Sequence, residues 1–496
     1  MVGLSNAMPF VSIELDRSAP VPMHRQLYDY LRAAILSGRL AGGLRLPATR
    51  TLATELGVSR NTVMSAFDQL LAEGYMEGRV GAGTYVARVL PDEVLYVAAQ
   101  PGENSGASQA GRAISRRGRL VATMPRTPAR FRDLPMAFRP SLPALDAFPF
   151  RTWAGLLSKR WRGPSPEMLE PGDPAGYRPL REAVAGYLGA ARGVRCHPDQ
   201  VIITTGSQQA LDLVARTLLD PGDTAWIEEP GYLGTRGALL AASIRLAPVP
   251  VDGEGLNVTV GIARAPHARL ICVSPSCQYP LGMTMSLGRR LALLEWASKA
   301  GAWVLEDDYD SEYRYANRPL AALQGIDTEG RVIYVGSFSK VLFPSLRLGY
   351  LVAPPDLVDP FVAMRSRTDL HAPTPEQIVL TDFIVEGHFA RHIRRMRSLY
   401  AGRQAVLVEA SAQELQGLLA VPTADAGMHL TGWLPAGTDD NAASAKALSH
   451  SVYVPALSSY YLGKPGPPGL LLGYTAVSES EIKAGVHRLA LALDTH

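Results

Sequence analysis

Short β-rich runs alternate with helical stretches in the part of the chain that follows residue 134. The clearest runs are VIITTG, LICVSPS, WVLEDDY and VIYVGSFSK, which begin at Val201, Leu270, Trp303 and Val332. Strands that alternate with helices form parallel sheets covered by helices. The pattern therefore predicts an α/β fold with a mixed, mainly parallel sheet.

Residues 88–133 break this pattern, because they are rich in Gly, Ser, Ala and Arg and have almost no apolar periodicity. Eight arginines stand there against four acidic residues. This local excess fits a solvated linker, a nucleic-acid partner, or both. A chain of 496 residues allows two or three domains. We therefore predict an N-terminal domain at 12–87, a flexible basic linker at 88–133 and a larger domain at 134–490.

Three features bear on the compartment. No apolar run approaches the roughly 20 residues that a membrane span needs. The N-terminal segment lacks a basic region before an apolar stretch, so we expect no signal peptide. The three cysteines have neither metal-ligand spacing nor the density of a disulfide scaffold. We expect a cytoplasmic chain with no metal site and no membrane contact.

The segment before the linker predicts a helix-turn-helix. Apolar residues at helical spacing mark one helix at 22–36 and a short second helix after LPATR. A break at Gly57 and an N-cap at Ser59 then begin a third helix. The polar residues at its start would project into the major groove: Ser59, Arg60, Asn61 and Thr62. The alternative is a small helical domain with a solvated helix start.

The next residues, YMEGRVGAGTYV, form two short alternating runs around glycines. Such a pattern indicates a β-hairpin wing, which would carry Arg79. The order of these elements resembles the GntR family of winged-helix regulators across roughly residues 20–87. By motif match, the resemblance implies DNA contacts from Arg50, Ser59, Arg60, Thr62, Arg79 and Gly81. Met64 departs from the arginine found there in some members.

Lys340 follows the run VIYVGSFS, and Arg347 stands seven residues later. An isolated lysine of this kind would be a surface residue, but its companions indicate a site. Asp307 and Tyr309 end another apolar strand, and in α/β sheets strand ends gather ligand groups. Gly206 and Ser207 link a strand to a helix, whose first amides can hold a phosphate.

These residue types are those that pyridoxal phosphate (PLP) requires. Lys340 would form the Schiff base, Asp307 would pair with the pyridine nitrogen and Tyr309 would donate to the phenolic oxygen. Tyr232 would stack on the ring. The phosphate would be held by Ser207, Ser337 and Arg347. We include three neighbouring residues among the cofactor-binding candidates: Gly206, Gln208 and Ser339.

Residues from about 135 to 490 resemble the fold-type I, class I/II aminotransferases, with GDPAGYRPLREAVAGYL, TTGSQQALDL, EEPGY, PSCQYPLG, EDDY, GSFSK and SLRLGY in family order. A GntR-like head followed by such a body is similar to the MocR/GabR family of PLP-dependent regulators. This resemblance implies a PLP-dependent transferase fold with a smaller C-terminal α/β subdomain. It also implies a domain-swapped homodimer that binds a double-stranded DNA operator.

Four positions depart from the aminotransferase pattern: Pro171, Cys277, Leu281 and Leu471. At Leu471 the family signature has an arginine that grips a substrate carboxylate. Without such a clamp, an ordinary amino-acid substrate is less well oriented for transamination. Arg236 or Arg365 could substitute for the missing arginine.

We therefore expect a transcription regulator that senses PLP, or an amine or amino acid that forms an external aldimine with it. At most, residual transaminase activity is expected. The alternatives are an active aminotransferase with an accessory DNA-binding domain, and a binding module that has lost PLP. The intact set of Asp307, Tyr309, Lys340 and Arg347 argues against the last.

Overall fold

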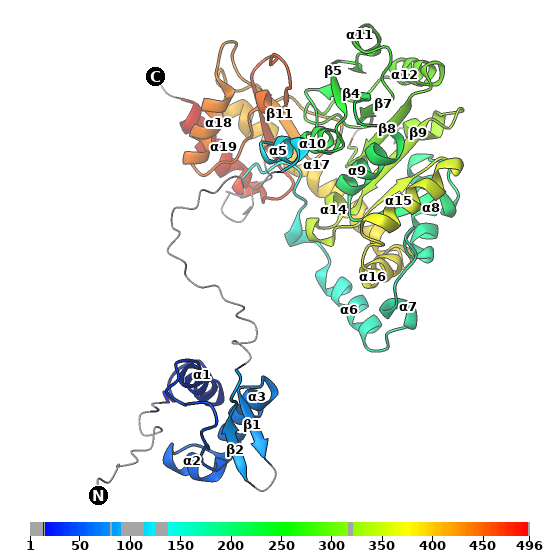
Figure 1. The fold of residues 1–496 in the computed structure, drawn as a ribbon. Coiled ribbons are helices and arrows are strands. Elements are labelled where there is room, and N and C mark those ends of the chain that lie inside the picture. Colours follow the sequence, from blue (N-terminus) through cyan, green and yellow to red (C-terminus); the bar gives the residue numbers. More distant parts are fainter. Residues whose placement is uncertain are drawn as a thin grey trace, which may run out of the picture. The chain divides into compact units, whose positions relative to one another are not determined.

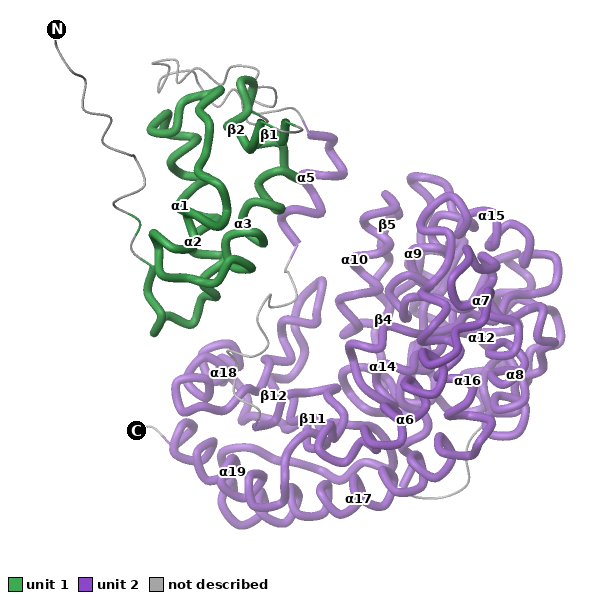
Figure 2. The backbone as a smooth tube through the Cα atoms, turned by 90° about the horizontal axis from the view of Figure 1, so that it is seen from below, with its two compact units in different colours: residues 1–112 green, residues 113–496 purple. Residues whose placement is uncertain are grey.

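The computed structural model describes residues 13, 15–79, 82–90, 114–124, 137–315 and 321–494. It divides into two compact units, residues 1–112 and 113–496 (Figure 2). Each unit buries hydrophobic residues of its own, one cluster in the first unit and four in the second. Within the described residues, no helix is long and apolar enough to cross a membrane.

The described part of the first unit contains three helices and a β-hairpin, as the sequence predicted. Its elements are α1 (Met23–Leu36), α2 (Thr49–Glu55), α3 (Arg60–Ala72), β1 (Met76–Arg79) and β2 (Gly83–Val86). The two strands pair antiparallel. Residues at helical spacing, such as Leu27, Leu52, Val63 and Phe67, are buried between the helices. Burial of this apolar stripe leaves the polar start of α3 exposed.

Much of the predicted linker lies outside the described residues. In the described part of the linker, the structure places the short helix α5 (Arg116–Ala122), which the composition did not indicate. The side chain of Ser115 caps α5 by accepting a hydrogen bond from the amide of Gly118 at 2.9 Å. The helix lies beside α10 (Leu233–Ala241) of the second unit.

The second unit is built on an eight-stranded sheet, in the order β3-β10-β9-β8-β7-β4-β5-β6 (Figure 1). The strands are β3 (Val201–Thr204), β4 (Thr224–Glu229), β5 (Arg245–Asp252), β6 (Gly255–Leu256), β7 (Leu270–Val273), β8 (Trp303–Asp308), β9 (Val332–Ser337) and β10 (Gly349–Val352). β10 is antiparallel to both neighbours and β6 is antiparallel to β5, whereas the other pairs are parallel. The predicted mixed, mainly parallel sheet is therefore confirmed.

Helices cover both faces of this sheet. The helices before α17 are α6 (Phe150–Trp161), α7 (Pro166–Leu169), α8 (Arg178–Arg192), α9 (Ser207–Leu218), α10, α11 (Val258–Arg264), α12 (Leu287–Ala300), α13 (Leu323–Ile326), α14 (Phe338–Val341), α15 (Val358–Thr368) and α16 (Thr374–Val385). Ile202 packs in one cluster with α9, α10 and α15. Its neighbours Val201 and Ile203 pack in another cluster with α8 and α16. Strand alternation thus divides the apolar residues between two cores.

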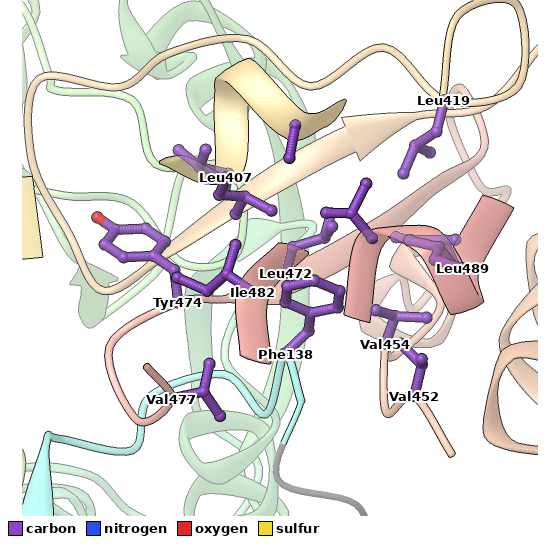
Figure 3. Packing of buried hydrophobic residues seen from close by; sticks show 14 of the residues in the cluster. Phe138, Leu407, Leu419, Val452, Val454, Leu472, Tyr474, Val477, Ile482 and Leu489 are labelled. Atoms are coloured by element: carbon purple, nitrogen blue, oxygen red, sulfur yellow. The ribbon is translucent and has the colours of Figure 1, made fainter. Parts of the chain in front are cut away.

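A smaller C-terminal part packs beside the sheet. It contains α17 (His388–Glu414), α18 (Asp440–Ser449), α19 (Glu479–Leu493) and a two-stranded antiparallel ribbon, β11 (His429–Trp433) and β12 (Gly469–Gly473). Its core gathers Leu407, Leu472, Ile482 and Leu489 around Phe138 (Figure 3). The segment around Phe138 therefore ties the start of the body to its end, and it leads on to Ser141 near the candidate site.

Candidate functional site

Lys340 lies where β9 ends in the short helix α14. The side chain of Ser337 accepts a hydrogen bond from the amide of Ser339 at 3.2 Å and so shapes this turn. Nζ of Lys340 donates to the carbonyl oxygen of Ser141 at 3.2 Å. Burial lowers the pKa of Lys340, although Asp310 and Asp307 oppose this shift. The amine is therefore easier to deprotonate than that of an exposed lysine, as a nucleophile requires.

Asp307 lies near the end of β8, the parallel neighbour of β9, and stands opposite Val335 in the register. Asp307 is 7% exposed, and its Oδ1 atom has no hydrogen-bond partner among the described residues. Burial raises the pKa of Asp307 to about 7, with a further contribution from Asp308, while Lys340 opposes the shift. A buried carboxylate oxygen without a partner fits a ligand that brings a protonated nitrogen.

The next acid, Asp308, forms hydrogen bonds within the protein. Its Oδ2 atom accepts hydrogen bonds from Arg192 at 2.9 Å and from the hydroxyl of Tyr334 at 2.5 Å. Successive strand residues point to opposite faces, so Asp308 is used inside the protein while Asp307 stays available.

The first turn of α9 and Arg347 form an anion cradle. Gly206 precedes α9 with φ of 108°, and a Cβ atom there would lie 3.3 Å from Nη2 of Arg347. The guanidinium therefore lies over the start of the helix, where amides and the helix dipole favour a negative group. The side chain of Gln208 donates to the carbonyl of Gly234 at 3.0 Å and so links α9 to α10. Oγ of Ser339 is buried without a partner among the described residues.

Aromatic rings line the same region. Tyr232, 39% exposed, directly precedes α10, and its ring centre lies 5.9 Å from that of Tyr279. Tyr279 also contacts the rings of Tyr309 at 6.1 Å, Tyr460 at 5.4 Å and His429 at 5.1 Å. Burial raises the pKa of Tyr232, as does Asp307, whereas Arg347 lowers it. Tyr232 is thus within electrostatic reach of both the acid and the cradle.

Tyr309 is buried and its hydroxyl donates to Sγ of Cys277 at 3.8 Å. Tyr279, His429 and Tyr460 also belong to this region, although they were not among the residues predicted from the sequence. Tyr279 lies in PSCQYPLG and could have been found there. The other two lie in the C-terminal part and stand in no recognisable local motif.

The arginines considered as substitutes at Leu471 differ in availability. Arg365 is fully buried, pairs with Asp369 at 2.7 Å and also donates to the carbonyl of Ile203. Arg236 donates to the carbonyl of Tyr461 at 3.4 Å and lines a cavity. That cavity also borders Asp307, Tyr232, Ser274, Tyr460 and Leu462. Arg365 is therefore committed to the scaffold, whereas Arg236 lies at the site.

In the first unit, Oγ of Ser59 accepts the amide hydrogen of Thr62 at 3.1 Å and caps α3. The exposed residues Arg50, Arg60 and Asn61 lie at the starts of α2 and α3. In the hairpin, the guanidinium of Arg79 lies 4.6 Å from the ring centre of Tyr85. Gly81, also predicted to contact DNA, lies outside the described residues. Groups of three or more metal-ligating side chains are absent from the described residues.

Comparison with known proteins gives two family matches. The family described as bacterial regulatory proteins, gntR family, matches residues 23–86. The family described as aminotransferase class I and II matches residues 157–489.

Individual relatives match along nearly the whole chain. The chain is 44% identical over 480 residues to a probable rhizopine catabolism regulatory protein, MocR, from Rhizobium meliloti, covering 96% of this chain and 95% of the relative. It is 29% identical to the pyridoxine biosynthesis transcriptional regulator PdxR of Corynebacterium glutamicum, over 95% and 96% of the two chains.

Among solved structures, the α-aminoadipate aminotransferase LysN from Thermus thermophilus, complexed with N-(5'-phosphopyridoxyl)-L-leucine, matches with a TM-score of 0.68 and 30% identity. The match covers 77% of this chain and 96% of LysN.

Proposed function

Since the chain belongs to the MocR-type transcription regulators, in which a gntR-family head is joined to an aminotransferase-like body, we propose that Lys340 anchors PLP and that an amino compound reaching it changes how the heads bind DNA. The observation that carries this proposal is the position of Lys340 and Asp307 near the ends of the adjacent parallel strands β9 and β8. A sheet places the two side chains together although 32 residues separate them in sequence.

PLP is the cofactor of this fold, and the residues fit it. When bound, PLP supplies an aldehyde that condenses reversibly with primary amines. The partnerless Oδ1 of Asp307 would hold the proton at the pyridine nitrogen. Tyr232 would stack on the ring, and Tyr309 would orient its phenolic oxygen.

The phosphate would lie in the cradle formed by the start of α9 and Arg347. A Cβ atom at Gly206 would crowd the guanidinium, so glycine keeps this cradle open. The side chains proposed to complete it are Ser207, Gln208, Ser337 and Ser339.

The head would bind double-stranded DNA with α3 in the major groove, through Arg50, Ser59, Arg60, Asn61 and Thr62, and with Arg79 and Gly81 of the wing in contact beside it. A homodimer would present two heads to a two-fold operator, with exchange of heads between subunits allowed by a linker at 88–133. A protein that binds chromosomal DNA would be located in the cytoplasm. The alternative, an active aminotransferase, would show multiple turnovers of amino transfer.

Two variants test whether PLP binding and DNA binding depend on different residues. Lys340→Ala should lose the absorbance of covalently bound PLP and keep its affinity for a duplex from the region upstream of its own gene. Arg60→Ala should keep PLP and weaken binding of that duplex by about 1–3 kcal/mol, the worth of one base contact. Affinity is measured by fluorescence anisotropy.

Matched controls are Lys299→Ala, an exposed lysine paired with Glu295, and Arg25→Ala, an arginine paired with Asp29. Both should behave as the unaltered protein. Loss of DNA binding in a folded Lys340→Ala variant, or unchanged PLP absorbance in it, would contradict the proposal.

A further inference from the structure

Six residues at the start of the body, 137–142, lie along the C-terminal part and are here called the strap. Phe138 and Gly473 of β12 form an antiparallel bridge, in which the amide of Gly473 donates to the carbonyl of Phe138 at 2.9 Å. Oγ1 of Thr475 donates to the carbonyl of Leu142 at 2.6 Å. The strap is therefore attached near both of its ends to β12 and the residues that follow this strand.

The middle of the strap is held by Lys340. Nζ of Lys340 donates to the carbonyl oxygen of Ser141 at 3.2 Å. Within the part of the chain that the structure describes, no other donor contacts this carbonyl. The carbonyls of Phe138 and Leu142 use donors of the C-terminal part. Ser141 is thus the residue through which the strap contacts the candidate site.

The strap is strained in this position. Phe138 has φ of 61° and Ser141 has φ of 60°, in the left-handed region that residues other than Gly, Asn and Asp rarely adopt. Such conformations persist only where the surroundings hold them. Phe138 is fully buried in the C-terminal core, whereas Ser141 is half-buried and has the hydrogen bond from Lys340. Ser141 would therefore relax when this donor is withdrawn.

A covalent bond to PLP withdraws the donor. When Nζ condenses with the aldehyde of PLP, a C=N bond forms, and two hydrogens of the Nζ ammonium group leave with the aldehyde oxygen as water. The nitrogen then keeps one hydrogen, or none after it has released a further proton to solvent, in place of the three on the free ammonium group. The bond to PLP therefore competes with the hydrogen bond to Ser141.

We propose that Ser141 is a positioning residue whose main-chain carbonyl holds the free amine of Lys340, and that the strap is released when Nζ bonds to PLP. An amine that displaces Nζ from PLP returns the donor, so the strap is held again. This inference rests on the proposed role of Lys340 as the anchor of PLP, and it adds the element that responds. The strap begins shortly after the predicted linker at 88–133, so its release occurs next to the segment that joins body and head.

Hydrogen exchange on the full-length protein tests the release. Three amides report on the attachment of the strap and the residues after it: Gly473, Tyr453, which donates to the carbonyl of Ala137 at 3.2 Å, and Ala144, which donates to the hydroxyl of Tyr400 at 2.9 Å. We expect PLP to speed exchange at these amides by about tenfold, the effect of losing one hydrogen bond from a charged group. Hydroxylamine, which removes PLP from Nζ, should restore slow exchange.

Two substitutions of Lys340 separate the hydrogen bond from the covalent bond. Lys340→Ala has no donor, so exchange without PLP should be as fast as in the loaded unaltered protein. Lys340→Arg keeps a donor for Ser141 but has no amine that condenses with PLP, so exchange should stay slow with or without PLP. The control is Lys299→Ala, at an exposed lysine paired with Glu295, which should respond to PLP as the unaltered protein does.

A second pair of variants tests the strain at Ser141 and leaves Lys340 in place. Glycine adopts the left-handed conformation without strain, so Ser141→Gly should reduce the response to PLP. Ser141→Ala keeps the Cβ atom that causes the strain and should respond like the unaltered protein. Both changes are small and lie at a half-buried position, so they provide the test if a variant of Lys340 does not fold.

The outcomes separate this inference from the proposed role of Lys340. Absence of the absorbance of covalently bound PLP contradicts that role. Covalent loading with unchanged or slower exchange at the three amides overturns the release of the strap. Slow exchange in a folded Lys340→Ala variant would show that the amine does not hold Ser141. Equal responses of Ser141→Gly and Ser141→Ala would overturn the part played by strain.

Discussion

Asp307 and Asp308 show how much a single position along a strand decides. Oδ2 of Asp308 pairs with Arg192 and accepts a hydrogen bond from Tyr334. Oδ1 of Asp308 and Oδ1 of Asp307 are both buried without a hydrogen-bond partner among the described residues. Burial raises the cost of ionising Asp307, and the negative charge of Asp308 raises it further. In the absence of a ligand, this cost lowers the stability of the folded state.

We therefore expect Asp307→Asn to stabilise the PLP-free protein increasingly as the pH rises. The pKa of Asp307 is raised from 3.8 to about 7, so between these values the folded state holds a proton that the unfolded state releases. The unaltered protein thus loses stability as the pH rises through this window, by at most about 1.4 kcal/mol per pH unit. The asparagine variant lacks this titration.

Urea unfolding of both proteins at about pH 5 and about pH 7.5 measures the difference in their free energies of unfolding. Asp356→Asn, at an exposed position, serves as the control. A difference that stays constant or shrinks with rising pH would show that Asp307 is already ionised in the folded protein.

At the scale of the element, α3 depends on how its first turn is capped. Gly57 adopts φ of 62° in the turn before it, and Ser59 then accepts from the amide of Thr62. An uncapped first turn would leave its amides without partners in a helix that must begin just after a tight turn. The cap therefore positions the polar residues proposed to enter the groove.

Replacing this cap should weaken the helix. We expect Ser59→Ala to destabilise α3 by about 1 kcal/mol, because the side-chain acceptor is lost. Ser59→Asp should keep the stability, since a carboxylate also caps. Hydrogen exchange of the amides in the first turn of α3 measures the effect, and Ser65→Ala, exposed within α3, is the control. Equal protection in Ser59→Ala would mean that the cap contributes nothing.

At the scale of the whole molecule, the two units bury separate cores. A ligand that binds one folded unit stabilises that unit by mass action and leaves an independent unit unchanged. The heads and the bodies should therefore melt separately.

Calorimetry should show two transitions, and PLP should raise only the one that belongs to residues 113–496. At a concentration 100 times its dissociation constant, PLP should add about 2.7 kcal/mol to the stability of that unit. Ser59→Ala identifies the other transition by lowering it, and Lys340→Ala should reduce the response to PLP. A rise of both transitions together would indicate that the units unfold as one.

The sequence by itself determined the features that depend on neighbours along the chain. The turn and cap before α3, the strand that delivers Lys340 and the glycine before α9 were predictable, because caps and strand ends are set by residues a few positions apart. The alternation of runs was enough for a mainly parallel sheet. The sequence order of the motifs also indicated which residues would meet PLP, and those roles stay predictions.

Only the tertiary structure decided which distant side chains share the site. His429 and Tyr460 lie far along the chain from Lys340, and the packing of the C-terminal part brings their rings against Tyr279. The register of β11 and β12 places Leu471 on the face of His429, and a shift of one residue would have turned it into the core. The tertiary structure also places the buried Arg365 in an ion pair with Asp369. Such contacts depend on three-dimensional packing, which local sequence patterns do not encode.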